Sequence, residues 1–287
     1  ALADVTTTPW NEEQCRMPVQ TTIFQETIGL RRELIAGRLA AAKDYLNTTT
    51  TNCRLGLSPH APYSVHPELF NGLVALAASA HVPLAFHLAE TLEERELLAT
   101  GGGPFRELLI ELDAWEEAAI PRGTRPFDYL RRLADSRVRS LIIHGNYLDD
   151  DEIALLATNA ARMTVVYCPR THAFFGHPRH PLPRLLAAGA KVALGTDSRA
   201  SNPDLNLFRE LQHVAENFSD IPPAVVLELA TLRPARALGL DHLLGAIEPG
   251  KAAVLATVPL PDEESPDPHE ILFASSARSV SVLACAP

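Results

Sequence analysis

Four short apolar runs of this sequence end directly in side chains that can bind a metal ion or move a proton. The four runs lead into His60, His87, His144 and Asp197. Imidazoles together with a carboxylate suit zinc and other divalent transition metals. Such an ion lowers the pKa of a bound water to about 7, so that hydroxide is available at neutral pH. The pattern therefore predicts metal-dependent hydrolysis, provided that one fold brings these ends together.

A proton-transfer group accompanies one of these histidines. Glu90 follows His87 by three positions, in His87-Leu88-Ala89-Glu90. From the end of a strand, this offset can carry the carboxylate toward a water bound at the metal. A partly dehydrated glutamate has a raised pKa and can pass a proton to a leaving nitrogen. Glu90 is therefore predicted to be catalytic.

The elements that must position these residues alternate between short apolar segments and amphipathic helical segments. This alternation is typical of parallel βα units, because a parallel strand needs a crossover helix. Several apolar runs are continuous, as expected of strands covered on both faces. In a βα barrel the chemistry lies at the C-terminal ends of the strands. The predicted strands are Thr22–Gln25, Arg54–Leu57, Val82–Phe86, Ser140–Ile143, Met163–Tyr167 and Lys191–Leu194. The predicted helices are Leu30–Leu46, Pro67–Ala80, Leu92–Ala99, Phe127–Ala134, Asp150–Thr158, Leu182–Ala188, Leu205–Asn217 and Ala224–Ala230.

The pattern changes in two places. Thr100–Pro126 is predicted to be a loop-rich insertion, which could serve as a lid or as a subunit contact. From Gly250 the chain reads as two short strands, Ala252–Val258 and Ser279–Leu283, around a turn rich in proline and acidic residues. We therefore predict a partial hydrolase barrel over residues 1–249 and the remnant of a small β-sandwich over residues 250–287.

The bulk composition narrows the function classes. The chain has 287 residues, of which 46% are hydrophobic, and barrels commonly run to roughly 250 residues. Its formal charge of -10 disfavours a general nucleic-acid binder. It has no apolar run of about 18 residues that would predict a membrane span. Four dispersed cysteines without a Cys-x-x-Cys pair favour a reducing, cytoplasmic location. A small-molecule substrate is expected, and self-association as a homo-oligomer stays open.

Several segments in order resemble the amidohydrolase superfamily, in its branch of mononuclear deaminases and chlorohydrolases. That branch includes adenosylhomocysteine and methylthioadenosine deaminases, guanine and cytosine deaminases, and s-triazine hydrolases. The resemblance covers nearly the whole chain and implies a (β/α)8 TIM-type barrel. The matching segments are Ser58–Ser64, His87–Thr91, His144–Gly145, Gly195–Asn202, Ala230–Thr231, Ala237–Leu240 and Gly245–Lys251.

The resemblance implies a role for each residue at the strand ends. His87 and Asp197 would be metal ligands, and Glu90 would be the proton shuttle. His144 would lie beside the metal, where it and Asp197 would handle the proton of the water. His60 would reach the substrate.

The resemblance also bears on the metal and on further substrate contacts. The dinuclear branch of the superfamily uses a carboxylated lysine on strand four, and Arg54–Pro59 contains no lysine. One divalent ion is therefore expected, most simply Zn²⁺, with Fe²⁺ as an alternative. Arg170 and His172, in the loop Cys168–His177, could bind substrate, although packing and loop rigidity explain them equally well.

One departure from the family pattern concerns its first strand. The family has a His-x-His pair at the end of strand one, whereas the first histidine of this chain is His60. We therefore expect an N-terminally truncated chain whose incomplete barrel lacks strand one. Two remaining protein ligands should bind zinc poorly, because catalytic sites usually provide three. Exposed strand edges also favour aggregation. The chain alone is predicted to be inactive.

The expected reaction is hydrolysis of a carbon–nitrogen bond other than a peptide bond, namely deamination of a small heterocycle by a metal-activated water. Hydrolysis of a cyclic amide, a carbamate or a carbon–chlorine bond on the same scaffold stays an alternative, as does a non-catalytic relative. The acidic pairs and triplets Glu93-Glu94 and Asp149–Asp151 are interpreted as solvated helix starts that complement the helix dipole. His66 is predicted to begin a helix, and His177 and His180 to support a loop.

Overall fold

The computed structural model describes residues 2–8, 10, 13–16, 20–48, 53–117, 119–262, 264–275 and 281–284. These residues form two compact units, which are described separately. The first unit comprises Ala1–Val165 with Ala188–Ala190, and the second comprises Val166–Ala187 with Lys191–Pro287.

The strands follow one another in the sheet in the same order as in the sequence. The first four neighbouring pairs are all parallel, and neighbouring strands from β1 to β7 are also consecutive in the sequence. Each connection therefore moves the chain by one strand, as in a barrel of βα units. This confirms the predicted α/β, TIM-type fold. The strands are β1 (Leu2–Thr6), β2 (Thr21–Thr27), β3 (Cys53–Pro59), β4 (Leu84–Leu88), β5 (Ser140–His144), β6 (Met163–Tyr167) and β7 (Lys191–Leu194).

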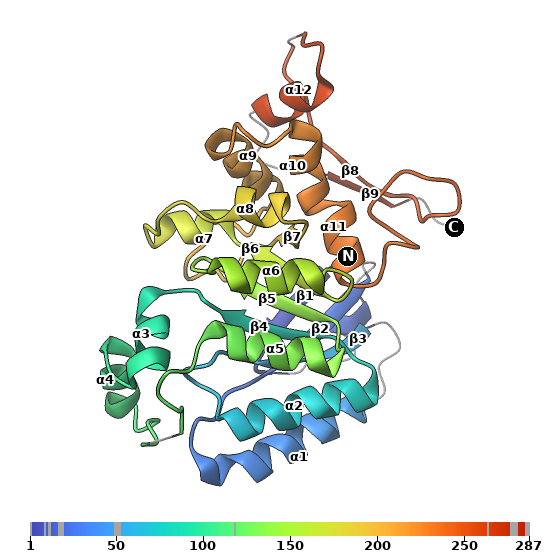
Figure 1. Ribbon diagram of the computed structural model, residues 1–287. Coiled ribbons are helices and arrows are strands. Elements are labelled where there is room, and N and C mark those ends of the chain that lie inside the picture. The colour runs from blue at the N-terminus through green and yellow to red at the C-terminus, as the bar shows by residue number, and fades with distance from the viewer. Residues whose placement is uncertain are drawn as a thin grey trace. The chain divides into compact units, whose positions relative to one another are not determined.

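Helices cover one face of the sheet in the first unit. Helices α1 (Ile35–Leu46), α2 (Pro67–Ala80) and α5 (Pro126–Ser136) lie side by side along β2 to β5 (Figure 1). Phe70 of α2 packs against Phe86 of β4, with ring centroids 4.8 Å apart, and against Tyr129 of α5 at 5.1 Å. All three rings are buried. Burial of each such side chain contributes about 1.5–3 kcal/mol, so this layer holds β4 in place.

The other face of β2 and β3 is closely packed without a helix. Phe24 of β2 lies opposite Gly56 of β3 in the parallel register. A Cβ atom at position 56 would meet the Phe24 ring at 2.5 Å, so only glycine leaves room for that ring. Glu26, two residues after Phe24, lies opposite Ser58 on the same face. The first unit therefore has an inner face that leads from apolar packing to polar side chains at the strand ends.

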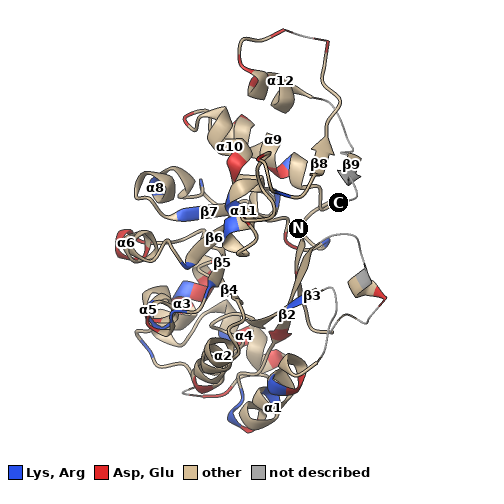
Figure 2. Ribbon diagram, turned by 90° about the vertical axis from the view of Figure 1, so that its right-hand side faces the viewer, with Lys and Arg blue, Asp and Glu red and all other residues tan. Residues whose placement is uncertain are grey.

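Few charged residues lie in the strands β1 to β5, which carry Asp4 in β1, Glu26 in β2 and Arg54 in β3. In Figure 2 most of the Lys, Arg, Asp and Glu residues of this unit lie on the helices and connections. The helices α3 (Leu92–Thr100) and α6 (Asp150–Thr158) also belong to this unit. Short 3-10 helices lie at Gln14–Arg16 and Arg32–Leu34.

The insertion after α3 is more ordered than the sequence predicts. It contains a helix, α4 (Pro104–Glu111), which begins at Pro104 with Gly103 as its N-cap. Proline suits the first position of a helix, because its fixed φ is helical and its missing N–H would be unpaired there. The expected loop-rich segment Thr100–Pro126 therefore contains a helix of eight residues, and its role as a lid or a subunit contact stays open.

The second unit starts with the end of β6. The N–H of Gly195, directly after β7, donates to the carbonyl of Tyr167 at 2.9 Å. Cys168–His177, expected as a loop, contains the short helix α7 (Pro169–Phe174). The other helices are α8 (Leu182–Ala187), α9 (Leu207–Asn217), α10 (Pro223–Ala230), α11 (Leu232–Ala237) and α12 (Pro268–Ala274).

The last strands form a sheet of their own. Strands β8 (Val254–Thr257) and β9 (Ser281–Ala284) pair antiparallel, with Val254 opposite Ala284. They match the two predicted terminal strands in part, since Ser279 and Val280 lie outside the described residues. Helix α12 between them was not predicted, and Asp267 caps it by accepting from the N–H of His269. The domain division at residues 249 and 250 stays a prediction. No helix in the described ranges is long and apolar enough to cross a membrane.

Candidate active site

His87 lies in β4 and is fixed by two hydrogen bonds to one carbonyl. Its backbone N–H and its ring Nδ1 each lie 2.9 Å from the carbonyl oxygen of His60. A carbonyl can only accept, so Nδ1 carries the proton and Nε2 carries the lone pair. Metal-binding histidines are typically oriented in this way, by a carbonyl or carboxylate on the second ring nitrogen. The structure therefore gives His87 the form that a metal ligand needs.

His60 follows β3 and is oriented in a similar way. Its backbone N–H donates to Thr27 at 3.1 Å, and its ring Nδ1 lies 2.6 Å from the hydroxyl of Ser64. Its ring centroid lies 5.0 Å from that of His87. Burial and the nearby His87 lower the pKa of His60 to about 4, so the imidazole is neutral at pH 7.

Glu26 joins these two histidines, although the sequence analysis missed it. One ligand atom from each of Glu26, His60 and His87 lies within 4.8 Å of the others. Burial raises the pKa of Glu26 above its ordinary value. The predicted strand stopped at Gln25, so Glu26 directly follows an apolar run in the same manner as His87 and His144. The signal was therefore present in the sequence.

Glu90 lies in the loop after β4, in a strained turn. Ala89 has φ of 54°, a left-handed conformation that is unfavourable for residues other than glycine. The carboxylate of Glu94 holds this turn by accepting from the N–H groups of Ala89 at 2.8 Å and Glu90 at 3.0 Å. Asn146 also donates to the carbonyl of Glu90, at 3.0 Å. The position of Glu90 is thus set by its neighbours in the fold.

Glu94 corrects the interpretation of Glu93-Glu94 as a solvated helix start. Its side chain is fully buried at the start of α3, where Thr91 caps the helix by accepting from the N–H of Glu94. Burial raises the pKa of Glu94 to about 8, while its hydrogen bonds from Glu90 and Ala89 lower it. Its buried carboxyl group positions the candidate catalytic loop, so Glu94 is a positioning residue.

His144 ends β5 and reaches the same cluster because its backbone leaves the strand conformation. Alternation would place its side chain on the face of Ile142, which is fully buried. Its φ of 71° breaks that alternation. The His144 ring lies 5.5 Å from the His87 ring, and its Nε2 lies 3.5 Å from a carboxylate oxygen of Glu90. The first unit therefore brings His60, His87, Glu90 and His144 together.

Asp197 lies in the second unit, directly after β7. It also has a left-handed backbone, with φ of 58°. Its carboxylate accepts from the hydroxyl of Ser201 at 3.0 Å, and that hydroxyl lies 2.9 Å from the hydroxyl of Thr171. Asn202 donates to the carbonyl of Thr196 at 2.8 Å and so fixes the preceding residue. Hydroxyl and amide side chains of this unit therefore hold Asp197 in place.

Arg170 and His172 have different surroundings in the second unit. The guanidinium of Arg170 lies 2.6 Å from Asp204 and 3.6 Å from the buried Glu210. This pairing favours a structural role. His172 is buried, its Nε2 has no hydrogen-bond partner among the described residues, and burial lowers its pKa to about 4. His172 is therefore the better candidate for a substrate contact, and both roles stay predictions.

Among the histidines expected to be structural, His66 caps α2 by accepting from the N–H of Glu68 at 3.1 Å. His180 stacks on Tyr167, with ring centroids 3.8 Å apart. Both observations fit their predicted supporting roles.

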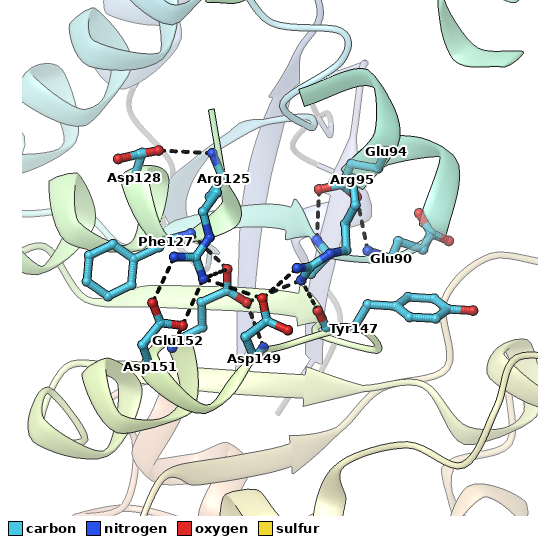
Figure 3. A network of polar contacts seen from close by, with 11 residues as sticks. Glu90, Glu94, Arg95, Arg125, Phe127, Asp128, Tyr147, Asp149, Asp151 and Glu152 are labelled. Atoms are coloured by element: carbon cyan, nitrogen blue, oxygen red, sulfur yellow. Dashed lines mark hydrogen bonds and ion pairs between the residues drawn. The ribbon is translucent and has the colours of Figure 1, made fainter. Parts of the chain in front are cut away.

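A second cluster of possible ligands lies near the start of α6, where Asp149, Asp151 and Glu152 also bring ligand atoms within 4.8 Å of one another. Here two arginines approach the carboxylates (Figure 3). Arg125 lies 2.9 Å from Asp151, and Arg95 lies 2.5 Å from Asp149. Glu152 directly follows the predicted solvated helix start Asp149–Asp151 and is fully buried. This cluster is an ion-pair network that joins α3, α5 and α6.

Comparisons with known proteins identify relatives of this chain. The chain is 32% identical over 211 residues to a 5-methylthioadenosine/S-adenosylhomocysteine deaminase of Pyrococcus furiosus, which covers 71% of this chain and 45% of the relative. It is 33% identical over 195 residues to an aminodeoxyfutalosine deaminase of Deinococcus radiodurans, a match that covers 65% of this chain and 46% of the relative. The chain thus spans about half the length of the curated relatives it matches.

Solved structures share the fold. An aminofutalosine deaminase of Helicobacter pylori in complex with methylthio-coformycin gives a TM-score of 0.74 at 22% identity, over 90% of this chain and 64% of that chain. A zinc-bound atrazine chlorohydrolase of Arthrobacter aurescens gives a TM-score of 0.73 at 20% identity, over 93% of this chain and 60% of that chain. The model of the amidohydrolase family matches residues 26–284, and the chain belongs to that family.

Proposed function

We propose that this chain carries the catalytic residues of a metal-dependent hydrolase that removes an amino group from a small heterocycle. The observation that carries the proposal is the placement of Glu90 beside His144, with Oε1 of Glu90 3.5 Å from Nε2 of His144, whose ring lies 5.5 Å from that of His87. The Glu90 side chain is 18% exposed, so it is accessible to a substrate yet partly dehydrated. This is the environment in which a glutamate can exchange protons.

The residues present fit a divalent transition metal. Nε2 of His87 carries the lone pair that a metal would bind, because Nδ1 is committed to the carbonyl of His60. The family resemblance assigns Asp197 to the same ion, and that assignment stays a prediction. When bound, the ion would supply Lewis-acid activation of a water at neutral pH. Zn²⁺ fits imidazole and carboxylate donors best, and Fe²⁺ is the alternative.

The chain's own residues would then manage the protons. Glu90 accepts a proton from the attacking water as the water oxygen bonds to the carbon that bears the amino group. Glu90 returns the proton to the leaving nitrogen, and the carbon–nitrogen bond breaks to release ammonia. His144 orients the water or the attacked group through its Nε2. Glu94 holds the Glu90 loop through its two backbone hydrogen bonds.

We propose an aminated purine nucleoside as the substrate. The names of several relatives, such as the 5-methylthioadenosine/S-adenosylhomocysteine deaminase of Pyrococcus furiosus, support this class. His172 has a buried Nε2 that a polar substrate group could satisfy. His60 and Arg170 stay in the proposal as possible substrate contacts. A cytoplasmic location fits the free thiols of Cys15, Cys53 and Cys168. Assembly as a homo-oligomer also belongs to the proposal.

Ammonia release tests the proposal. The 287-residue chain would be assayed with zinc beside a chimera in which a relative's first strand, with its paired histidines, precedes Leu2. The chimera is expected to deaminate 5′-methylthioadenosine, and Glu90→Gln should slow it by about 10²–10⁴-fold. The chain alone is expected to be inactive. Turnover of a cyclic amide or a chlorinated triazine in place of the aminated purine, or an unchanged rate in Glu90→Gln, would contradict the proposal.

A further inference from the structure

The loops after β4 and β5 are joined by hydrogen bonds along three consecutive residues. The carbonyl of Leu88 accepts from the N–H of Gly145 at 3.1 Å, and the carbonyl of Ala89 accepts from the N–H of Tyr147 at 3.0 Å. The next carbonyl, that of Glu90, also accepts a hydrogen bond from the loop after β5, at 3.0 Å. Both loops belong to the first unit, so this joint is part of one compact body.

The third of these bonds comes from a side chain, that of Asn146. Its Nδ2 donates to the carbonyl of Glu90. A carbonyl can only accept, so the amide nitrogen must face Glu90, and the orientation of the amide is fixed. Two successive left-handed residues precede it, His144 with φ of 71° and Gly145 with φ of 63°. They turn the backbone after β5, so that the side chain of Asn146 reaches the loop after β4.

Both backbone polar groups of Glu90 are therefore held by buried side chains. Glu94 accepts from its N–H at 3.0 Å (Figure 3), and Asn146 donates to its carbonyl. Glu94 is fully buried, and Asn146 is 8% exposed. Glu94 belongs to the same connection as Glu90, whereas Asn146 belongs to the connection that carries His144. Asn146 is thus the side chain that links Glu90 to the loop of His144, whose Nε2 lies 3.5 Å from Oε1 of Glu90.

Packing alone does not explain an amide at position 146. The Oδ1 atom of Asn146 is buried and has no hydrogen-bond partner among the described residues. A buried acceptor without a partner destabilises the fold, and a leucine would fill a similar volume without that penalty. The favourable contribution of the amide is its hydrogen bond to Glu90.

We propose that Asn146 is a positioning residue for proton transfer, because it locks the Glu90 loop to the His144 loop. The inference deepens the proposed function and rests on it, since Glu90 is the proton-transfer group there. Proton transfer needs the carboxylate within about 2.6–3.2 Å of the atom that it serves. A misplacement of about 1 Å can cost about 10²-fold in rate. A lock between the two loops keeps Glu90 within this reach.

Hydrogen exchange of the backbone amides, followed by NMR, tests the lock on the 287-residue chain without turnover. In the unmodified chain, the N–H groups of Glu90, Gly145 and Tyr147 should be protected to a similar degree, because the two loops open together. Asn146→Leu keeps the volume of the side chain and removes the donor. It should speed the exchange of these three amides by about 5- to 10-fold, as expected for one lost hydrogen bond.

Asn159→Leu is the matched control. Asn159 also donates its side-chain Nδ2 to a carbonyl, that of Leu155 at 2.9 Å, but it does so at the end of α6. Its loss should leave the exchange of the two loops within about two-fold. Unchanged exchange in Asn146→Leu would overturn the lock, and so would equally faster exchange of all amides. The comparison within the unmodified chain decides even if Asn146→Leu fails to fold, because rapid exchange of Glu90 beside protected Gly145 and Tyr147 would overturn it as well.

Kinetics of the chimera test the catalytic consequence. Asn146→Leu should lower kcat by about 10-fold or more, while KM and the affinity for Zn²⁺ stay within about two-fold, because Asn146 acts through Glu90 and touches neither substrate nor metal in this proposal. Asn159→Leu should keep the full rate. A loss that appears in KM, or an unchanged kcat, would overturn the positioning role. An inactive parent chimera would contradict the deaminase proposal instead, and hydrogen exchange would still decide whether Asn146 locks the loops.

Discussion

Two places in the first unit bring three potential metal ligands equally close, yet their chemistry differs. Glu26, His60 and His87 meet at strand ends, and Asp149, Asp151 and Glu152 meet at the start of α6. In the second cluster Arg95 and Arg125 supply the positive charge (Figure 3). In the first, the histidines are oriented by a carbonyl and a hydroxyl, and no arginine or lysine among the described residues forms an ion pair with Glu26.

The difference shows that proximity of ligand atoms does not by itself identify a metal site. Buried or crowded carboxylates need a counter-charge, and either a cationic side chain or a metal ion can supply it. The deciding observation is which of the two is already present in the protein. By that criterion the cluster at α6 is a structural junction, whereas the cluster at the strand ends has no arginine or lysine paired with Glu26 among the described residues.

The largest expected effect comes from removing His87, the proposed metal ligand in β4. His87→Ala should weaken zinc binding by about 100-fold or more, because the ion loses an oriented imidazole. The double variant Asp149→Ala/Asp151→Ala should bind zinc normally, since its carboxylates are paired with arginines. Calorimetric titration of both proteins measures the contrast. Equal losses in the two variants would erase the distinction between the clusters.

The cluster at the start of α6 is expected to contribute to the stability of the fold. Glu152 is fully buried, accepts from the N–H of Asp149 at 2.8 Å and of Phe127 at 3.2 Å, and lies 3.5 Å from Arg95. Glu152→Ala leaves two backbone donors and part of the arginine charge unpaired, and should cost about 3 kcal/mol of unfolding free energy. Urea unfolding measures this loss.

The control for Glu152 lies in the same helical turn. Asp150 is exposed, and Asp150→Ala should change stability by less than about 0.5 kcal/mol. Zinc affinity should be unchanged in both variants, provided that the folded fraction is equal. Similar stability losses at positions 150 and 152 would show that the network is not a junction.

The sequence could identify the strand-end residues but not the buried carboxylates. His87 and His144 stand out because each interrupts an apolar run, which is a local signal. Glu94 and Glu152 are acidic residues in the first turns of helices, where most such residues face water. Their burial depends on contacts outside their own helices, with the turn at Ala89 for Glu94 and with the start of α5 at Phe127 for Glu152. Local patterns carry no record of those contacts.

The same limit applies to backbone geometry. A period of two predicts which face a strand residue occupies, and it places His144 with Ile142. The left-handed φ of His144 overrides that period. It accompanies a hydrogen bond from the N–H of Gly145 to the carbonyl of Leu88 at 3.1 Å, which exists only once β4 and β5 are adjacent. The residue could therefore be predicted as functional, but its position could not.

A smaller effect should appear in the pH dependence of stability. Burial raises the pKa of Glu94 from 4.5 to about 8 in the folded state, so the folded protein binds more protons than the unfolded chain between these values. Stability contributed by this group is therefore complete below pH 4.5 and is lost as the pH rises toward 8, by at most about 1.4 kcal/mol for each pH unit. Glu94→Gln stays neutral and should flatten this decline. Urea unfolding at pH 5, 6.5 and 8 compares the two proteins, and parallel declines would contradict the prediction.

The smallest effect sharpens the comparison most, because it touches no ligand. Ser64→Ala removes the hydroxyl that lies 2.6 Å from Nδ1 of His60, so the ring can rotate and can place its proton on either nitrogen. If His60 contacts substrate, the KM of the active chimera should rise by about 10-fold, because one oriented hydrogen bond weakens. Ser79→Ala, which removes an exposed hydroxyl bonded to the carbonyl of Leu76, should leave the KM unchanged. An unchanged KM in Ser64→Ala would mean that the orientation of this imidazole does not matter for substrate binding.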